Sequence, residues 1–131
     1  MAIRVTAAII IKDRKVLVAR RKPGGKMEGH WEFPGGKIDP NETPEECLRR
    51  EIDEELGVRD LVIQEHFLTT THAYPFADIE LIVFLCTSKT LPHSSQAHDL
   101  LEWATLDQLS SYQWAPADVP AVQKLIAEFP D

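Results

Sequence analysis

The sequence predicts one α+β domain in which a mixed β-sheet lies between helices, an α/β/α sandwich. Short apolar runs bounded by Gly, Pro and Asp predict strands in both halves of the chain. Two amphipathic segments, Thr43–Leu56 and Ala117–Phe129, predict helices. A sheet between two helices buries the apolar surface of every element. Because 131 residues suit one hydrophobic core, we expect residues 1–131 to form a single domain.

Alternating and apolar segments place the strands in order along the chain. A turn at Lys12–Arg14 joins the first two strands, and a turn near Pro75–Asp78 joins a later pair. Glycine and proline keep residues 22–30 and 34–43 irregular. The predicted strands are Ile3–Ile11, Lys15–Ala19, Trp31–Phe33, two within residues 61–88, and one within Leu101–Leu106.

The two helices carry local signals for their positions. Thr43, Pro44 and Glu46 have the form of a capping box with proline at the first helical position, and Gly57 ends the helix. The C-terminal helix is predicted from an apolar stripe made by Val119, Val122, Leu125, Ile126 and Phe129.

Composition and charge exclude several classes of function. Fourteen Lys and Arg against 21 Asp and Glu give a net charge of −7, which opposes binding to a nucleic-acid polymer. There is no apolar run of membrane-spanning length and no pattern typical of a signal peptide, so we expect a cytoplasmic protein without a membrane partner. Cys47 and Cys86 lack zinc-site spacing, which predicts two buried thiols. Whether the chain is a monomer or a homodimer stays open.

The first helix concentrates negative charge on one side. Glu51, Glu54 and Glu55 occupy i, i+3 and i+4 positions, so their carboxylates project from one face. An adjacent apolar stripe packs the helix on the sheet and consists of Leu48, Ile52 and Leu56. Carboxylates that converge in this way need a counter-charge, and hard oxygen ligands suit Mg²⁺ or Mn²⁺.

Two other interpretations of the acidic segment fit its residues less well. The first is a solvated face whose repulsion is relieved by Arg49 and Arg50, but the carboxylates cluster instead of alternating with cations. The second is an EF-hand loop starting at Asp39. That loop would place Pro44 where glycine must turn and Arg50 where the bidentate Glu belongs.

The same residues resemble the Nudix box, GX5EX7REUXEEXGU, in which U is aliphatic. Gly36, five residues, Glu42, seven residues, and then the run from Arg50 to Val58 fit the pattern. Arg20-Arg21, the run WEFPGGK and the run WAPADVPAV are similar to the MutT-type branch of the Nudix hydrolases. The resemblance covers nearly the whole chain.

This resemblance implies Mg²⁺-dependent hydrolysis of nucleoside triphosphates to nucleoside monophosphate and pyrophosphate, with Mn²⁺ as a substitute. The implied role is sanitation of the nucleotide pool, with 8-oxo-dGTP and cytidine nucleotides as leading substrates. A dinucleoside polyphosphate or another nucleoside diphosphate derivative is an alternative substrate. A nucleotide-binding sensor without turnover is a further alternative, although a sensor has no need for three convergent carboxylates.

The resemblance also implies roles for single residues. Glu51 resembles the general base, and Arg50 and Glu42 resemble a supporting pair that orients the carboxylates. The implied metal ligands are Glu51, Glu54, Glu55 and the carbonyl of Gly35. A loop late in the sheet supplies a further ligand in MutT-type enzymes; here Asp99 is the first choice, Glu102 the second and His98 the third.

The remaining candidates concern the substrate. Arg21 and Lys37 resemble phosphate contacts. Asp118 resembles the residue that faces the base, where a carboxylate suits the N4 amine of cytosine or the N1 and N2 hydrogens of a guanine-type base. Asp118 also occupies the position of an N-cap for the last helix, which is the alternative interpretation of this residue. Further candidates are the aromatic residues Phe33 and Trp114, which either enclose the base or belong to the core, and Tyr74, which marks either a dinucleotide hydrolase or a strand turn.

Overall fold

The structure is a computed structural model that describes residues 2–92 and 94–129. Seven strands, two α-helices and two 3₁₀ turns follow one another within these residues. In order they are β1 (Ala2–Lys12), β2 (Lys15–Arg21), β3 (Trp31–Glu32), β4 (Gly35–Lys37), α1 (Pro44–Leu56), β5 (Val62–Ala73), β6 (Asp78–Thr87), β7 (His98–Thr105), η1 (Leu106–Ser111), η2 (Pro116–Asp118) and α2 (Val119–Glu128). The predicted domain also includes residues 1, 93, 130 and 131, which lie outside the described residues.

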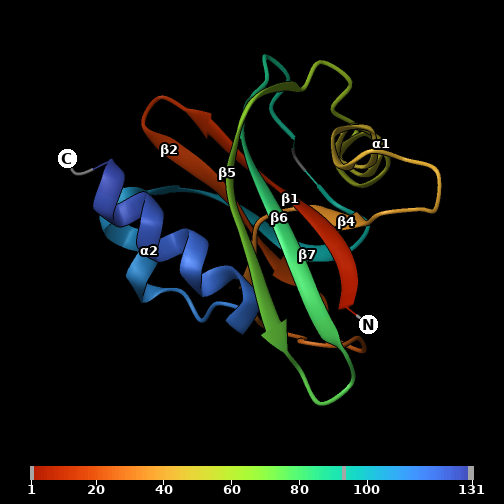
Figure 1. The fold of residues 1–131 in the computed structure, drawn as a ribbon. Coiled ribbons are helices and arrows are strands. Elements are labelled where there is room, and N and C mark those ends of the chain that lie inside the picture. The colour runs from red at the N-terminus through yellow and green to blue at the C-terminus, as the bar shows by residue number, and fades with distance from the viewer. Residues whose placement is uncertain (1, 93, 130–131) are drawn as a thin grey trace.

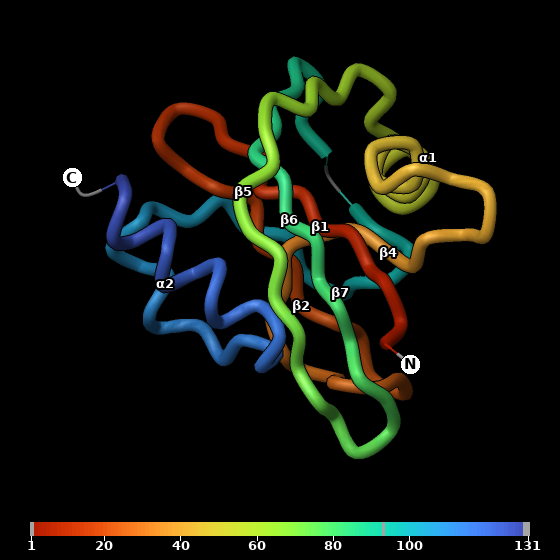
Figure 2. The backbone as a smooth tube through the Cα atoms, viewed as in Figure 1, coloured from red at the N-terminus to blue at the C-terminus, as the bar shows by residue number. Residues whose placement is uncertain are grey.

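The strands form one mixed sheet in the order β3-β2-β1-β6-β5, with β4 also pairing with β1 and β7 with β2. β1 and β6 are parallel and run side by side through the centre of the molecule (Figure 2). The other strand pairs are antiparallel. The prediction of a mixed sheet is therefore confirmed.

The two α-helices lie on opposite sides of this sheet (Figure 1). One buried cluster joins the sheet to α2 and includes Ile9, Val18 and Leu125. The other joins the sheet to α1 and includes Leu17 and Ile52. Two separate apolar layers thus make the predicted α/β/α sandwich. Within the described residues, no helix is both long and apolar enough to cross a membrane.

Helix α1 has the ends that its sequence predicts. The Thr43 side chain accepts a hydrogen bond from the Glu46 N–H, and the Glu46 carboxylate accepts one from the Thr43 N–H. Gly57 closes the helix in the left-handed conformation, with φ of 69°. These caps hold one acidic face of α1 in a fixed position beside β4.

The segment after Phe33 is more regular than predicted. Residues Gly35–Lys37 form the short strand β4 instead of continuing a loop. A Cβ at Gly35 would lie 2.0 Å from the carbonyl oxygen of Thr6, so only glycine allows β4 to approach β1 this closely. Gly35, which the sequence assigns to a loop, is thus required by the contact between strands β4 and β1.

The C-terminal helix and strand β7 also differ from prediction. α2 begins at Val119, after the η2 turn, and buries Ala121, Val122 and Leu125. Ile126 and Phe129, which belong to the predicted apolar stripe, are each 40% exposed, so the helix buries only part of that stripe. Strand β7 starts at His98, three residues before the predicted strand, because its polar first residues pair with the end of β2.

Candidate active site

Three carboxylates of α1 open onto one groove of about 470 Å³. Glu51, Glu54 and Glu55 line it from the helix, and Gly35 lines it from β4. The opposite wall comes from the end of β2 and the segment before β7, through Arg21, Lys22, Gln96 and Ala97. The predicted convergence of the carboxylates and Gly35 is thus present in the fold.

Arg50 organises the acidic residues around it. Its Nε and Nη2 donate to the two carboxylate oxygens of Glu42 at 2.9 and 2.7 Å, a bidentate pair. Its Nη1 donates to Glu51 at 2.8 Å and to Glu54 at 3.4 Å. Hydrogen bonds to Glu42 raise the pKa of Arg50 above its ordinary value. One guanidinium therefore ties the loop before α1 to two carboxylates of the groove.

Glu42 is held from both sides. Its carboxylate accepts hydrogen bonds from Arg50 and, at 2.8 Å, from the backbone N–H of Asp39. The Arg50 bonds, followed by the Asp39 bond, lower the pKa of Glu42 to about 2. Glu42 is therefore ionised at neutral pH and anchors Arg50 as a fixed counter-charge.

Gly36 makes room for the Glu51 side chain. A Cβ at this position would lie 2.3 Å from the carboxyl carbon of Glu51. The carboxylate thus passes directly over the bare backbone of β4, beside the groove. Gly35 is therefore required by its close approach to backbone, whereas a side chain at Gly36 would have to displace the end of the Glu51 side chain.

The carboxylate of Glu55 lacks a full set of hydrogen-bond partners. Its Oε2 atom is buried and has no hydrogen-bond partner within the part of the chain that the structure describes. Burial, followed by the charges of Glu51 and Glu32, raises its pKa to about 8. An unpartnered buried oxygen among like charges is the arrangement that a divalent cation would stabilise.

The carboxylates are near one another without already forming a metal cage. Across residues 2–92 and 94–129, no three His, Cys, Asp or Glu side chains stand close enough to enclose an ion as they are. The reason is visible at Arg50, which draws Glu51 and Glu54 toward its guanidinium. The residues nevertheless fit a divalent cation, because the donor set is carboxylate oxygen with one buried oxygen unpaired.

A second hollow of about 210 Å³ adjoins the groove through Arg21, which lines both. Asp118 lines this second hollow, is 4% exposed, and accepts a hydrogen bond from the Phe33 N–H at 3.2 Å. Burial, followed by the charge of Glu32, raises the pKa of Asp118. Asp118 occupies the N-cap position of α2, as the alternative predicted, but its side chain makes no capping hydrogen bond to the helix.

Aromatic side chains form one wall of the second hollow. Tyr74 follows β5 at the turn into β6, and its ring stacks on that of Phe76 with centroids 5.0 Å apart. The Tyr74 hydroxyl accepts a hydrogen bond from the Ala117 N–H at 2.9 Å. Lys26 lies 4.4 Å from the centroid of the Phe76 ring. The hollow thus combines flat apolar surfaces with a few polar groups, as small-molecule sites do.

Comparison with known proteins identifies the family. The model of the NUDIX domain matches residues 2–127. The chain belongs to the NUDIX family. It is a Nudix pyrophosphohydrolase, and hydrolases of this family generally need a divalent metal.

Individual relatives agree with this assignment. The CTP pyrophosphohydrolase of Escherichia coli K12 is 32% identical over 125 residues, which cover 95% of this chain and 92% of the relative. The 8-oxo-dGTP diphosphatase of Proteus vulgaris is 41% identical over 86 residues, covering 65% and 76%. A solved structure of DNA mismatch repair protein MutT, a Nudix hydrolase of methicillin-resistant Staphylococcus aureus 252, is 41% identical, with a TM-score of 0.79 and 98% of each chain covered.

Two residues of this Nudix hydrolase that were predicted as metal ligands, Asp99 and Glu102, do not line the carboxylate groove. Asp99 forms a bidentate ion pair with Arg20, at 2.9 and 2.8 Å, and is not part of the groove lining. Glu102 accepts a hydrogen bond from the Tyr112 hydroxyl at 2.8 Å. The late segment instead reaches the groove through Gln96 and Ala97. The structure therefore gives no support to Asp99 or Glu102 as a metal ligand.

Two residues of the Nudix hydrolase that were predicted to contact the substrate, Lys37 and Phe33, do not line the carboxylate groove or the second hollow. Lys37 lines a separate depression beside Asp39 and Glu42 instead of the carboxylate groove. Phe33 is 3% exposed and packs on Trp114 with centroids 4.9 Å apart. Its ring belongs to the core, which is the alternative reading of these two aromatic residues, and it reaches the second hollow only through its backbone bond to Asp118.

Glu32 was missed as a site residue of the Nudix hydrolase. It lines the second hollow, forms an ion pair with Arg21 at 3.2 Å and contributes to the raised pKa of both Glu55 and Asp118. A single Glu in the short run WEF has no distinctive pattern. Its importance follows from the pairing of β3 with β2, which sets Glu32 opposite Ala19.

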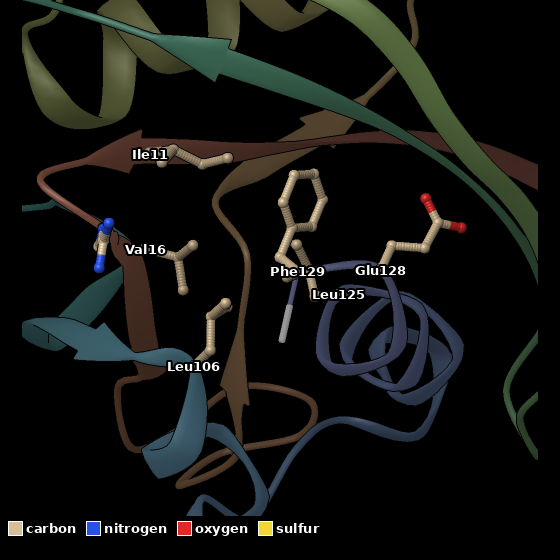
Figure 3. A pocket seen from close by; sticks show the side chains of 7 residues that line it. Ile11, Val16, Leu106, Leu125, Glu128 and Phe129 are labelled. Atoms are coloured by element: carbon tan, nitrogen blue, oxygen red, sulfur yellow. The ribbon is translucent and has the colours of Figure 1, made fainter. Parts of the chain in front are cut away.

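A third hollow, of about 510 Å³, is shown in Figure 3 and shares no lining residue with the carboxylate groove or the second hollow. Its walls come from β1, β2, η1 and the end of α2, with Ile11, Val16, Leu106, Leu125 and Phe129 in view. Glu128 is the one carboxylate of its lining. This apolar cavity of the Nudix hydrolase therefore has no metal-binding character.

Proposed function

We propose that this Nudix hydrolase cleaves free nucleoside triphosphates to nucleoside monophosphate and pyrophosphate, with Mg²⁺ as its metal and Mn²⁺ as a substitute. One observation carries the proposal: Arg21 lines both the carboxylate groove and the second hollow. A triphosphate on the groove side and its base on the other side of Arg21 would occupy both sites at once. The second hollow is smaller than the roughly 300 Å³ of a typical whole-ligand site, which suits one part of a larger molecule.

The metal would be held by Glu51, Glu54, Glu55 and the carbonyl of Gly35, which all line the groove. When bound, the ion acidifies a water molecule and offsets charge on the phosphate oxygens. Glu51 is the proposed general base. Its place over Gly36 and its hydrogen bond from Arg50 fix the carboxylate at the groove, within reach of a water molecule bound there.

Arg50 and Glu42 act as a support in this proposal. The bidentate pair fixes the guanidinium, and the guanidinium in turn fixes Glu51 and Glu54. Arg21 is the proposed phosphate contact, held by Glu32 and by the Lys26 carbonyl at 2.8 Å. Rates in such a site depend on positioning and on electrostatics that exist before the substrate arrives.

Asp118 is the proposed contact to the base. A carboxyl group with a raised pKa can either accept a hydrogen bond or donate one, so it suits both N–H groups and ring acceptors. The names of the relatives support 8-oxo-dGTP and CTP as the leading candidates. Removal of damaged or unwanted nucleotides from the cytoplasmic pool would be the role, for a monomer or a homodimer.

A nucleotide panel tests the proposed reaction. Purified protein is incubated with 8-oxo-dGTP, dGTP, CTP, dCTP and a dinucleoside tetraphosphate, each with Mg²⁺ or with excess chelator, and the products are separated. The proposal predicts monophosphate and pyrophosphate in Mg²⁺ and no products in chelator. Cleavage of the tetraphosphate alone, into two nucleotides, would assign a dinucleotide hydrolase, and binding of a nucleotide without any products would assign a sensor.

A further inference from the structure

Three side chains continue the site inward from Arg21 as a chain of hydrogen bonds. Arg21 Nη1 lies 3.2 Å from Glu32 Oε2, which lies 2.8 Å from His98 Nε2. His98 Nδ1 lies 2.8 Å from the Ser95 hydroxyl oxygen, which also accepts the Ala97 N–H at 3.2 Å. The groove wall at Ala97 is thus linked to Arg21 by Ser95, which precedes β7, His98 of β7 and Glu32 of β3.

In this hydrogen-bond network, each donor faces an acceptor. The Glu32 carboxylate accepts from Arg21, so His98 Nε2 meets it as a donor. His98 Nδ1 then accepts from the Ser95 hydroxyl, whose oxygen receives the Ala97 N–H. Both ring nitrogens of His98 have a partner in this tautomer, as expected for a buried polar network that fixes one arrangement.

His98 is fully buried, as a core residue is, but it contacts Glu32, which lines the second hollow. Its side chain is 0% exposed, while Glu32 is 20% and Arg21 35% exposed. His98 pairs across the sheet with Arg21, where a β-bulge shifts the register between Arg20 and Arg21. Bulges re-aim side chains beside functional sites. Both ring nitrogens are engaged within the network, which leaves His98 in a positioning arrangement instead of a metal-binding one.

We propose that His98 is a positioning residue that sets the Glu32 carboxylate against Arg21 and ties Ser95–Ala97 to the groove. The inference rests on the proposed function, because it assigns Arg21 to the bound nucleotide. His98 itself does not line either hollow. Its effect is therefore transmitted through Glu32, and it should change nucleotide binding more than the chemical step.

Isosteric variants separate this role from general stability. The amide nitrogen of His98→Gln can occupy the place of Nε2 and donate to Glu32, whereas the shorter His98→Asn replaces only the Nδ1 end near Ser95. The matched control is His66→Asn, because His66 also makes a side-chain hydrogen bond, to Thr69 at 2.7 Å, but lies on β5 away from both hollows. Folded fraction is measured for all variants by thermal unfolding.

The readouts are KM and kcat for the best nucleotide of the panel, together with the equilibrium Kd of that nucleotide in chelator. His98→Asn is expected to raise KM and Kd by about 10-fold, the loss expected for one hydrogen bond to a charged group, with kcat little changed. His98→Gln is expected to stay close to wild type, as is His66→Asn. A purely structural histidine would instead lower the folded fraction and kcat together and leave KM and Kd unchanged.

Equal behaviour of His98→Asn and His98→Gln, or unchanged KM and Kd in both, would overturn the positioning role. Failure of the proposed function would appear in the wild-type protein itself. If the wild type binds a nucleotide without cleaving it, the Kd values alone decide the role of His98. If the wild type neither binds nor cleaves any member of the panel, both the function and the positioning role are wrong.

Discussion

Replacing Glu55 with Gln should stabilise the metal-free protein at neutral pH. Burial and the charges of Glu51 and Glu32 raise the pKa of Glu55 from 4.5 to about 8 in the folded state. Because the folded pKa is raised, the wild type is unaffected below pH 4.5 and loses stability as the pH rises toward 8. At pH 7, two and a half pH units above the ordinary pKa of this group, the free energy of unfolding of the wild type is lowered by about 3 kcal/mol.

Urea unfolding in excess chelator, at pH 4 and pH 7, measures this difference. The Gln variant is neutral at both pH values, so it should match the wild type at pH 4 and exceed it by about 3 kcal/mol at pH 7. Added Mg²⁺ should then stabilise the wild type, by about 2.7 kcal/mol at 100 times Kd, and the variant less. A difference independent of pH, or one that Mg²⁺ leaves unchanged, would refute the assignment of Glu55 to the cation.

Three further substitutions test the rest of the site. Arg50→Lys removes the bidentate pair with Glu42, and kcat should fall roughly 10–100-fold with an unchanged circular dichroism spectrum; full activity would contradict the support role. Gly36→Ala places a Cβ 2.3 Å from the carboxyl carbon of Glu51, so activity should fall while the fold persists, and an active variant would show that the Glu51 position is unimportant. Asp118→Asn should change the ratio of kcat/KM for 8-oxo-dGTP and CTP by roughly 10–100-fold, and an unchanged ratio would exclude a base contact.

Local sequence patterns predicted the features that depend on neighbours in the chain. The α1 caps at Thr43 and Gly57 follow from hydrogen bonds and backbone conformations within a few residues. The convergence of Glu51, Glu54 and Glu55 follows from helical periodicity. These parts need no knowledge of the rest of the fold.

Features set by strand register could not be predicted from the sequence. The β-bulge between Arg20 and Arg21 determines which late residues face the groove, and it leaves Asp99 paired with Arg20. Glu32 and His98 lie 66 positions apart and meet only because β2 pairs with both β3 and β7. A shift of one residue in either pairing would place these side chains on another face.

In the proposed site, the α1 carboxylates hold the metal that supports hydrolysis. The most direct measurement compares Mn²⁺ binding and pyrophosphate release for wild type, Glu54→Gln and Glu45→Gln. Glu45 is an exposed acid in the first turn of the same helix and serves as the control. We expect Glu54→Gln to lose most metal binding and turnover while remaining folded, and Glu45→Gln to match the wild type. Unchanged Mn²⁺ binding and turnover in Glu54→Gln would contradict the account.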